Sequence, residues 1–158
     1  MTLPTINRNT ALETSFKLEI PGLEEFNYFV QEAALPGLSM AGVDLPFRNN
    51  QASVPSNRID YESVQIPFVV AEDFLNHSAI RLWMHRISKG PGPLINELKD
   101  VTLHLLNSNK NTIKRVVYYS AYPTALTGIP LRSNVPNTGP LFCTLSLKYQ
   151  YYDVLPSL

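Results

Sequence analysis

The sequence has one cysteine, little charge and no long apolar run. Because Cys143 is the only cysteine, an intramolecular disulfide is excluded, and no group of cysteines and histidines has the spacing of a zinc site. No segment has the about 18 unbroken apolar residues of a membrane span, and the first residues lack the apolar core of a secretory signal. We therefore expect a soluble protein made in the cytoplasm, with no membrane partner, metal or cofactor.

Charge is scarce as well as balanced. Charged residues make up 16% of the 158 residues, against about 25% in an average soluble domain. Two explanations stay open: part of the surface is buried against other chains, or the surface is polar through Asn, Ser and Thr. Thirteen basic residues balance thirteen acidic ones, so the chain lacks the overall positive charge that drives tight, salt-dependent binding to nucleic acid or anionic lipid.

No set of residues predicts catalysis. His77 and His85 are not at the i, i+3 or i+4 spacing of metal ligands on a helix, and His104 lies elsewhere. The paired carboxylates have no acid, base or metal ligand near them in the sequence: Asp60 with Glu62, and Glu72 with Asp73. The G-x-S-x-G, P-loop and dinucleotide-binding motifs are absent. We therefore predict that the protein is not an enzyme.

Basic and aromatic residues are mixed around one predicted turn: Lys110, Lys114, Arg115, Tyr118, Tyr119 and Tyr122. Such a mixture is found in stacking platforms for single-stranded nucleic acid. These tyrosines fall on both faces of a predicted strand, however, so core residues with a polar rim are the better interpretation. Cys143 lies on the apolar face of another strand, and we interpret it as a small core residue rather than a reactive thiol.

Alternating polar and apolar residues predict a mainly β protein. The predicted strands cover residues 16–20, 26–35, 38–47, 64–70, 101–105, 113–120 and 141–151. Pro21-Gly22 joins the first two strands as a hairpin, and a polar turn before Ile113 joins a second hairpin. Pro67 has no N–H to donate, so its strand has an unpaired side or a bulge. The last segment is expected to form one continuous strand with an apolar face and a polar, nearly uncharged face.

One segment has helical periodicity, with apolar residues at i, i+3, i+4 and i+7: Ile80, Trp83, Met84 and Ile87. We expect Asn76 to cap the first turn and Gly90 to end the helix. Strands precede and follow this helix without the βαβ alternation of a parallel sheet. The sequence therefore predicts a single domain over residues 1–158, an antiparallel β-sandwich or barrel with one packed α-helix.

Two segments do not fit a compact core. Residues 1–13 are polar and weakly patterned, and we expect a loose N-terminal arm. Residues 29–70 begin and end as strand, are interrupted by Leu35-Pro36-Gly37, and have a polar middle that contains prolines. Because no compact core would absorb that middle, we expect it to project from the domain.

The order of these features resembles the tail tube proteins of contractile-tailed phages, the T4-type tube, and more distantly the tube protein of type VI secretion. The matching features are, in order, Phe16 to Ile20, Phe29 to Ala34, Leu35-Pro36-Gly37, Val43 to Phe47, Tyr61 to Val70, Glu72-Asp73, the Trp83 helix, Val101 to Leu105, Lys114 to Tyr119, Ala121-Tyr122-Pro123 and Thr144 to Tyr152. Each feature alone is common, and the ordered set, which covers nearly the whole chain, carries the resemblance.

The resemblance implies a β-sandwich protomer that forms rings of six copies, with strands from all six in a continuous inner β-barrel. Stacked rings would form a tube that passes DNA. The partners would be other copies of the chain, the tail sheath, and baseplate and tape-measure proteins. The protein would then belong to the virion tail and be assembled in the host cytoplasm. Relatives in the family form the baseplate ring that initiates a tube or the ring that terminates it, and both alternatives stay open.

The resemblance also implies two contact surfaces. The neighbouring ring would be reached by a projecting loop over residues 43–58, through Val43, Asp44, Leu45, Pro46, Phe47, Arg48, Asn49, Asn50 and Arg58. The lumen would be lined by the polar face of the last strand, through Thr144, Ser146, Lys148 and Gln150, unless that face contacts the sheath instead. A different class of function, a small β-fold module that binds nucleic acid or a protein partner, also stays open.

Overall fold

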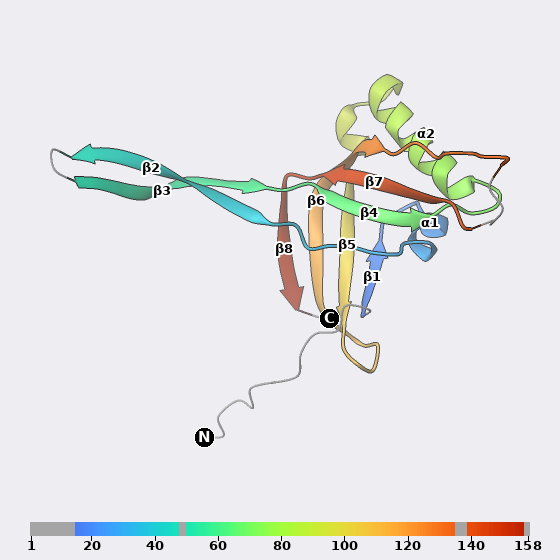
Figure 1. The fold of residues 1–158 in the computed structure, drawn as a ribbon, viewed down its shortest axis with the longest axis horizontal. Helices are drawn as coiled ribbons and strands as arrows, with labels where there is room; N and C mark the ends of the chain where they lie inside the picture. The colour runs from blue at the N-terminus through green and yellow to red at the C-terminus, as the bar shows by residue number, and fades with distance from the viewer. Residues whose placement is uncertain (1–14, 48–49, 135–138, 157–158) are drawn as a thin grey trace.

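The computed structural model describes residues 15–47, 50–134 and 139–156. Its elements are β1 (Phe16–Glu19), α1 (Glu24–Tyr28), β2 (Leu38–Phe47), β3 (Asn50–Tyr61), β4 (Val64–Val69), α2 (Leu75–Lys89), the 3₁₀ helix η1 (Leu94–Glu97), β5 (Lys99–Leu106), β6 (Thr112–Leu126), β7 (Phe142–Lys148) and β8 (Tyr151–Pro156). Every strand pair is antiparallel. The expected fold class, mainly β with antiparallel sheets, is confirmed, and a second short α-helix accompanies the expected one (Figure 1).

The strands of the body form two sheets that share β6. The first sheet has the order β1-β5-β6-β8, and the second has the order β6-β7-β4. The strand β6 is 15 residues long, and its two halves pair with different neighbours. The change occurs near Ser120, whose φ of 53° lies in the left-handed region and whose N–H donates to Asp100 Oδ1 at 3.0 Å. This local bend lets one strand belong to two sheets that cross (Figure 1).

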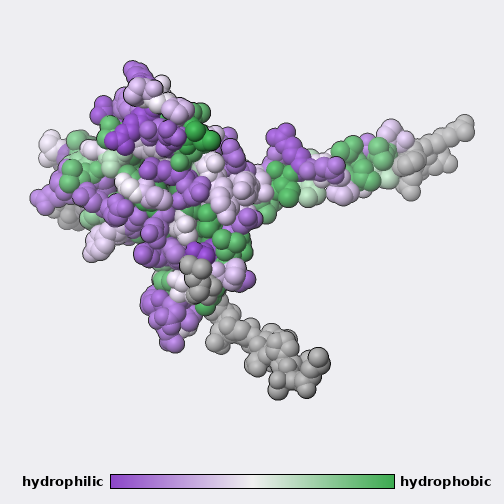
Figure 2. Space-filling view, turned by 180° about the vertical axis from the view of Figure 1, so that it is seen from behind, coloured by the Kyte–Doolittle hydropathy of each residue, from purple (hydrophilic) through white to green (hydrophobic). Residues whose placement is uncertain are grey.

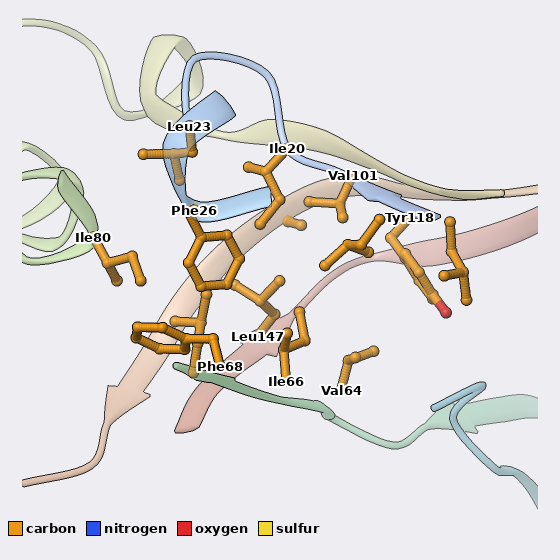
Figure 3. Close-up of a cluster of buried hydrophobic side chains, with 14 of the residues drawn as sticks. Ile20, Leu23, Phe26, Val64, Ile66, Phe68, Ile80, Val101, Tyr118 and Leu147 are labelled. Carbon is orange, nitrogen blue, oxygen red and sulfur yellow. The ribbon is translucent and has the colours of Figure 1, made fainter. Parts of the chain in front are cut away.

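The core lies between the two sheets and the helices. Its side chains come from both sheets, α1 and α2, and the labelled ones converge in Figure 3: Ile20, Leu23, Phe26, Val64, Ile66, Phe68, Ile80, Val101, Tyr118 and Leu147. The rings of Phe26 and Phe68 meet edge to face, with centroids 4.8 Å apart. Because each buried ring contributes roughly 1.5–3 kcal/mol, this contact fixes α1 against the second sheet.

The prediction of a hairpin between residues 16–20 and 26–35 is wrong. Residues 24–28 form the helix α1, and β1 pairs with β5 instead. Asn27 explains the difference, because its side chain takes the place of a strand partner: Ile20 N–H donates to Asn27 Oδ1 at 2.9 Å, and Asn27 Nδ2 donates to Ile20 O at 3.3 Å. Further along, Gln31 N–H donates to Pro67 O, so the rest of the expected strand only borders β4.

The expected closing strand is interrupted. It ends at Lys148, and β8 begins at Tyr151 and pairs with the first half of β6. Within β7 the expected alternation holds, because Cys143, Leu145 and Leu147 are buried. Tyr151, which was expected on the same apolar face, is exposed. The chain turns at Gln150, whose N–H donates to Tyr119 O at 3.0 Å, so the period of two does not continue across the turn.

The helix α2 is confirmed, but its first turn is built differently from the expectation. Phe74 occupies the N-cap position with a φ of 56°, and Asp73 Oδ1 accepts from Leu75 N–H at 3.1 Å. Asn76 is buried and connects the helix to β4: its Oδ1 accepts from Ala71 N–H, and its Nδ2 donates to Val69 O. The helix ends before Gly90, as expected.

Candidate assembly surfaces

The strands β2 and β3 form a hairpin that extends far from the body (Figure 1). Most of the residues expected in the inter-ring loop lie in these strands: Val43, Asp44, Leu45, Pro46 and Phe47 in β2, and Asn50 and Arg58 in β3. Arg48 and Asn49 lie outside the described residues. The segment is therefore a two-stranded ribbon rather than a loop, and its two strands pair from Leu38 to its outer end.

The outer part of the hairpin has one apolar face. Cross-strand partners in an antiparallel ladder share a face, and Val43 pairs with Val54 while Leu45 pairs with Ala52. The exposed fractions of Val43 and Leu45 are 49% and 40%. The intervening pair, Asp44 with Ser53, places polar groups on the other face.

The inner part of the hairpin is also apolar on one face. Leu38 pairs with Tyr61 and Met40 pairs with Ile59, and a register shift after Met40 separates this patch from the outer one. Figure 2 shows hydrophobic residues (green) spaced along the projecting hairpin. An isolated two-stranded ribbon is at best marginally stable in water, and exposed apolar surface of this kind marks an interaction site. The hairpin is therefore a candidate contact surface.

The root of the hairpin is held by a group of four tyrosines, which sequence reasoning missed: Tyr61, Tyr118, Tyr149 and Tyr152. The ring of Tyr61 contacts those of Tyr149 and Tyr152 at centroid distances of 5.8 and 5.9 Å, and Tyr118 contacts the same two rings. Glu62 adds polar contacts, because Glu62 N–H donates to Gly37 O and Gly37 N–H donates to the Glu62 carboxylate, both at 3.3 Å.

Two members of the tyrosine group, Tyr118 and Tyr149, have raised pKa values. Burial, followed by the neighbouring Tyr152, Tyr61 and Glu62, raises the pKa of Tyr149 to about 12. Burial, followed by Tyr149 and Tyr152, also raises the pKa of Tyr118. The folded protein therefore favours the neutral phenols of Tyr118 and Tyr149 over their charged forms.

The expected lumen residues lie on and beyond β7. Thr144 and Ser146 are half-buried, and Ser146 Oγ donates to Gln65 Oε1 at 2.7 Å across the pair β7–β4. Lys148 is exposed at the end of β7, whereas Gln150 lies in the turn that follows. The structure brings the first three together on one outward, mostly uncharged face of the second sheet, and it separates Gln150 from them.

The first sheet has two free edges among the described residues. The strand β1 pairs on one side with β5, and β8 pairs on one side with β6. The edge of the second sheet at β4 is different, because residues 29–31 border it: Val69 N–H donates to Phe29 O and Gln31 N–H donates to Pro67 O, both at 3.0 Å. Pro67 lies on this edge strand, as expected.

The basic and aromatic residues of β6 do not form one platform. Tyr118 points into the core and is buried, whereas Tyr119 stacks on Tyr151 of β8 with ring centroids 4.7 Å apart. The described ranges contain no group of three or more His, Cys, Asp or Glu side chains that could hold a metal ion. None of the helices in these ranges is long and apolar enough to cross a membrane.

The fold is similar to tube proteins of known structure. A chain of the PVC sheath-tube complex, from an extracellular contractile injection system in its extended state, has a TM-score of 0.69 and 13% identity, covering 95% of this chain and 94% of that chain. The tube-terminating cap of the anti-feeding prophage has a TM-score of 0.69 and 12% identity, covering 96% and 95%. Hcp1 from Flavobacterium johnsoniae has a TM-score of 0.54 and 16% identity, covering 88% and 93%.

At these identities the likeness to solved structures shows the fold alone. No curated protein sequence matches the chain. The family model described as "Phage tail tube protein" matches residues 1–155, nearly the whole chain. This is a family of structural tube proteins rather than of enzymes. The chain therefore belongs to the phage tail tube protein family.

Proposed function

We propose that six copies of this chain form a ring, and that stacked rings form a tail tube whose lumen passes DNA. The observation that carries this proposal is the first sheet, whose edge strands β1 and β8 each lack an outer neighbour within the described ranges and could pair with another copy. Exposed sheet edges invite uncontrolled association, and closing the sheet between subunits removes them.

The strand directions fit such a closure. Each step from β1 to β5, β6 and β8 is antiparallel, so β1 and β8 run in opposite directions. When β8 of one copy lies beside β1 of the next, the new pair is antiparallel too. The same pairing then repeats around a ring without a change in pattern, as a closed cyclic assembly requires.

The outward face of the first sheet suits a lumen. Its registered rows contain charges of both signs, with Lys17 and Arg115 in one row and Glu19 and Asp153 in the next. Mixed charge offers the phosphates of DNA no continuous cationic track, so few counterions are released and the DNA is not held. In this arrangement the polar face of β7 lies outside the barrel and is available to the sheath, which is the alternative placement for Thr144, Ser146 and Lys148.

The hairpin then supplies the contact between rings. Its exposed apolar faces, with Val43 and Leu45 on the outer part and Met40 and Ile59 on the inner part, would be buried against the neighbouring ring. The remaining proposed partners are the tail sheath, the baseplate and the tape-measure protein. The proposed location is the tail of the virion, assembled in the host cytoplasm.

A second candidate is an end ring of the same tube, either the baseplate initiator or the terminator. The observation in its favour is the fold, because chains from the baseplate and the tube-terminating cap of the anti-feeding prophage have TM-scores of 0.64 and 0.69, against 0.69 for the sheath-tube complex. An end ring would stack on one side only, so purified protein would give single or paired rings instead of long tubes.

Electron microscopy of the concentrated, purified chain tests the proposal. We expect six-fold rings or tubes, with the ring mass checked by native mass spectrometry. A chain that stays monomeric and binds a single-stranded oligonucleotide less tightly as salt rises would instead be a small binding module. A ring of another symmetry would contradict the six-fold closure while keeping the free-edge mechanism.

A further inference from the structure

One face of α2 is exposed and carries residues at a regular helical spacing; we call this face the seam. Five residues follow spacings of three and four along it: Leu75, Ser78, Leu82, His85 and Lys89. This is the spacing by which one helix packs along another. The two leucines of the seam have exposed fractions of 50% and 51%, while Ile80 and Trp83 on the opposite face are buried in the core. The helix therefore packs against the core with one side and exposes a second apolar stripe on the other.

Cations lie beside this stripe and at its end, and acidic residues are absent from the helix. Arg81, Arg86 and Lys89 are all exposed, and within the described ranges none of the three forms an ion pair. The sequence has no acidic residue between Asp73 and Glu97. Favourable interaction with the helix dipole accounts for Arg86 and Lys89 in the last turn. It does not account for Arg81 in the middle of the helix, nor for the exposed leucines.

We propose that this face of α2 binds an amphipathic helix of a partner protein, with leucine-type side chains on the seam and Asp or Glu beside it. Charge complementarity selects the acidic partner, because every residue of α2 that carries a full charge is basic. The apolar stripe favours a protein over a nucleic acid, since phosphates would leave Leu75 and Leu82 exposed. Helix-in-groove and helix-on-helix recognition use anchors at this spacing.

The position of α2 indicates which partner is meant, and this step rests on the proposed function. Ile80 and Trp83 belong to the same buried cluster as Val101 and Val116 of the first sheet, so α2 lies on the core side of that sheet. When the other face of the sheet lines the lumen, α2 faces the outside of the tube. Pairing of two copies through α2 would be a closed two-fold contact and would not extend a ring. The surrounding protein, the sheath in a contractile tail, is therefore the proposed occupant.

Two synthetic helical peptides test the chemistry directly. Both carry leucines at heptad a and d positions, but one has Glu and the other Lys at the flanking positions. We expect the Glu peptide to bind the full-length protein in a titration followed by NMR, with shifts confined to α2, and to bind less tightly as salt rises. Equal affinity for the two peptides, shifts elsewhere, or an oligonucleotide that displaces the Glu peptide would overturn the proposal.

A matched pair of variants locates the site. The double variant Arg86→Glu, Lys89→Glu reverses two charges on and beside the seam, and Lys17→Glu, Lys114→Glu makes the same net change on β1 and β6. We expect the first to weaken binding of the Glu peptide by about tenfold or more, and the second by less than about twofold. The milder Arg86→Gln, Lys89→Gln variant gives the same direction if charge reversal disturbs the helix. Equal loss in the α2 and control variants would contradict the assignment.

A further experiment tests whether α2 lies on the outside of the tube. Rings or tubes of the Arg86→Glu, Lys89→Glu variant should assemble normally, because α2 takes no part in the proposed ring contacts. Peptide added to preformed wild-type tubes should still bind, because the helix faces outward. Binding to the monomer that is lost on assembly would place α2 inside the assembly and overturn the inference, whereas absence of any tube would contradict the proposed function and leave the peptide result standing.

Discussion

Tyr149 Oη donates a hydrogen bond to the backbone carbonyl of Glu62 at 2.9 Å. The first residue lies just before the turn between β7 and β8, and the second follows β3 at the root of the hairpin. This bond and the contact between the rings of Tyr61 and Tyr149 join the projecting hairpin to the body. Because a long ribbon amplifies any rotation at its root, we infer that the tyrosine group sets the direction in which the hairpin points.

Replacing Tyr149 with Phe should loosen the hairpin without unfolding the body. The substitution removes one hydrogen bond, worth about 0.5–1.5 kcal/mol, and keeps the ring contacts. We expect a small decrease in the free energy of unfolding and faster amide hydrogen exchange in β2 and β3. Tyr151→Phe is the control, because Tyr151 is exposed and lies outside the tyrosine group. Unchanged exchange in the hairpin would show that this bond does not restrain it.

The protein should lose stability at alkaline pH. The folded state raises the pKa of Tyr149 to about 12, above the ordinary value of about 10, so it holds this proton more tightly than the unfolded chain does. The resulting stabilisation is complete below about pH 10 and is lost as pH rises toward 12. Urea midpoints measured across this window should fall, and the fall should be smaller in Tyr149→Phe. The remaining fall in the urea midpoint is expected from Tyr118, whose pKa is also raised.

Deleting Ala41 to Asn57 should prevent rings from stacking without unfolding the body. The deletion removes the outer hairpin, which pairs only within itself along this part of the ladder, so the body should remain folded. We expect a circular dichroism spectrum and melting midpoint close to those of the full chain, with rings that no longer stack into tubes. Normal tubes from this variant would contradict the role assigned to residues 43–58.

The substitution Leu145→Asp should unfold the protein. Leu145 is fully buried on β7, and an unpaired carboxylate there costs several kcal/mol, comparable to the whole stability of a small domain. The exposed neighbour Lys148 offers the control, because Lys148→Asp lies on the same strand but in water. Thermal unfolding followed by circular dichroism should show a lost or strongly lowered transition for Leu145→Asp only.

Asn76→Ala should destabilise α2 and its junction with β4. The Asn76 side chain accepts from Ala71 N–H and His77 N–H and donates to Val69 O. Its removal leaves buried backbone groups without partners, at about 1–3 kcal/mol for each unpaired group. Urea unfolding should show a loss of more than about 2 kcal/mol. Asn76→Asp, which keeps the acceptor and loses the donor, should fall between the wild type and Asn76→Ala.

Local sequence patterns predicted the elements whose structure depends on residues that are close in sequence. The helix α2 follows from its apolar spacing, and the hairpin β5–β6 follows from alternation on both sides of a polar turn. The buried residues of β7 follow from the same rule, because Cys143, Leu145 and Leu147 alternate with polar residues. In each case the pattern has one period and the structure uses that period without interruption.

The prediction failed where hydrogen bonds other than the expected strand pairing decided the course of the backbone. Asn27 reaches Ile20 and ends the expected first hairpin, and Gln150 turns the chain where alternation alone predicts a continuing strand. Neither residue carries a pattern that reveals this role. The tyrosine group was missed for a similar reason, because Tyr61 lies far in sequence from Tyr149 and Tyr152.

The sequence by itself determined the class of this protein: a mainly β fold with one long helix, no set of residues that predicts catalysis, and an ordered set of features that resembles the tail tube family. Only the tertiary structure decided that β1 and β8 become free edges of one sheet and that residues 38–61 form a projecting ribbon. The physical reason is that burial patterns record which face of a strand is dry, whereas the choice of neighbouring strand depends on long-range contacts that leave no local period.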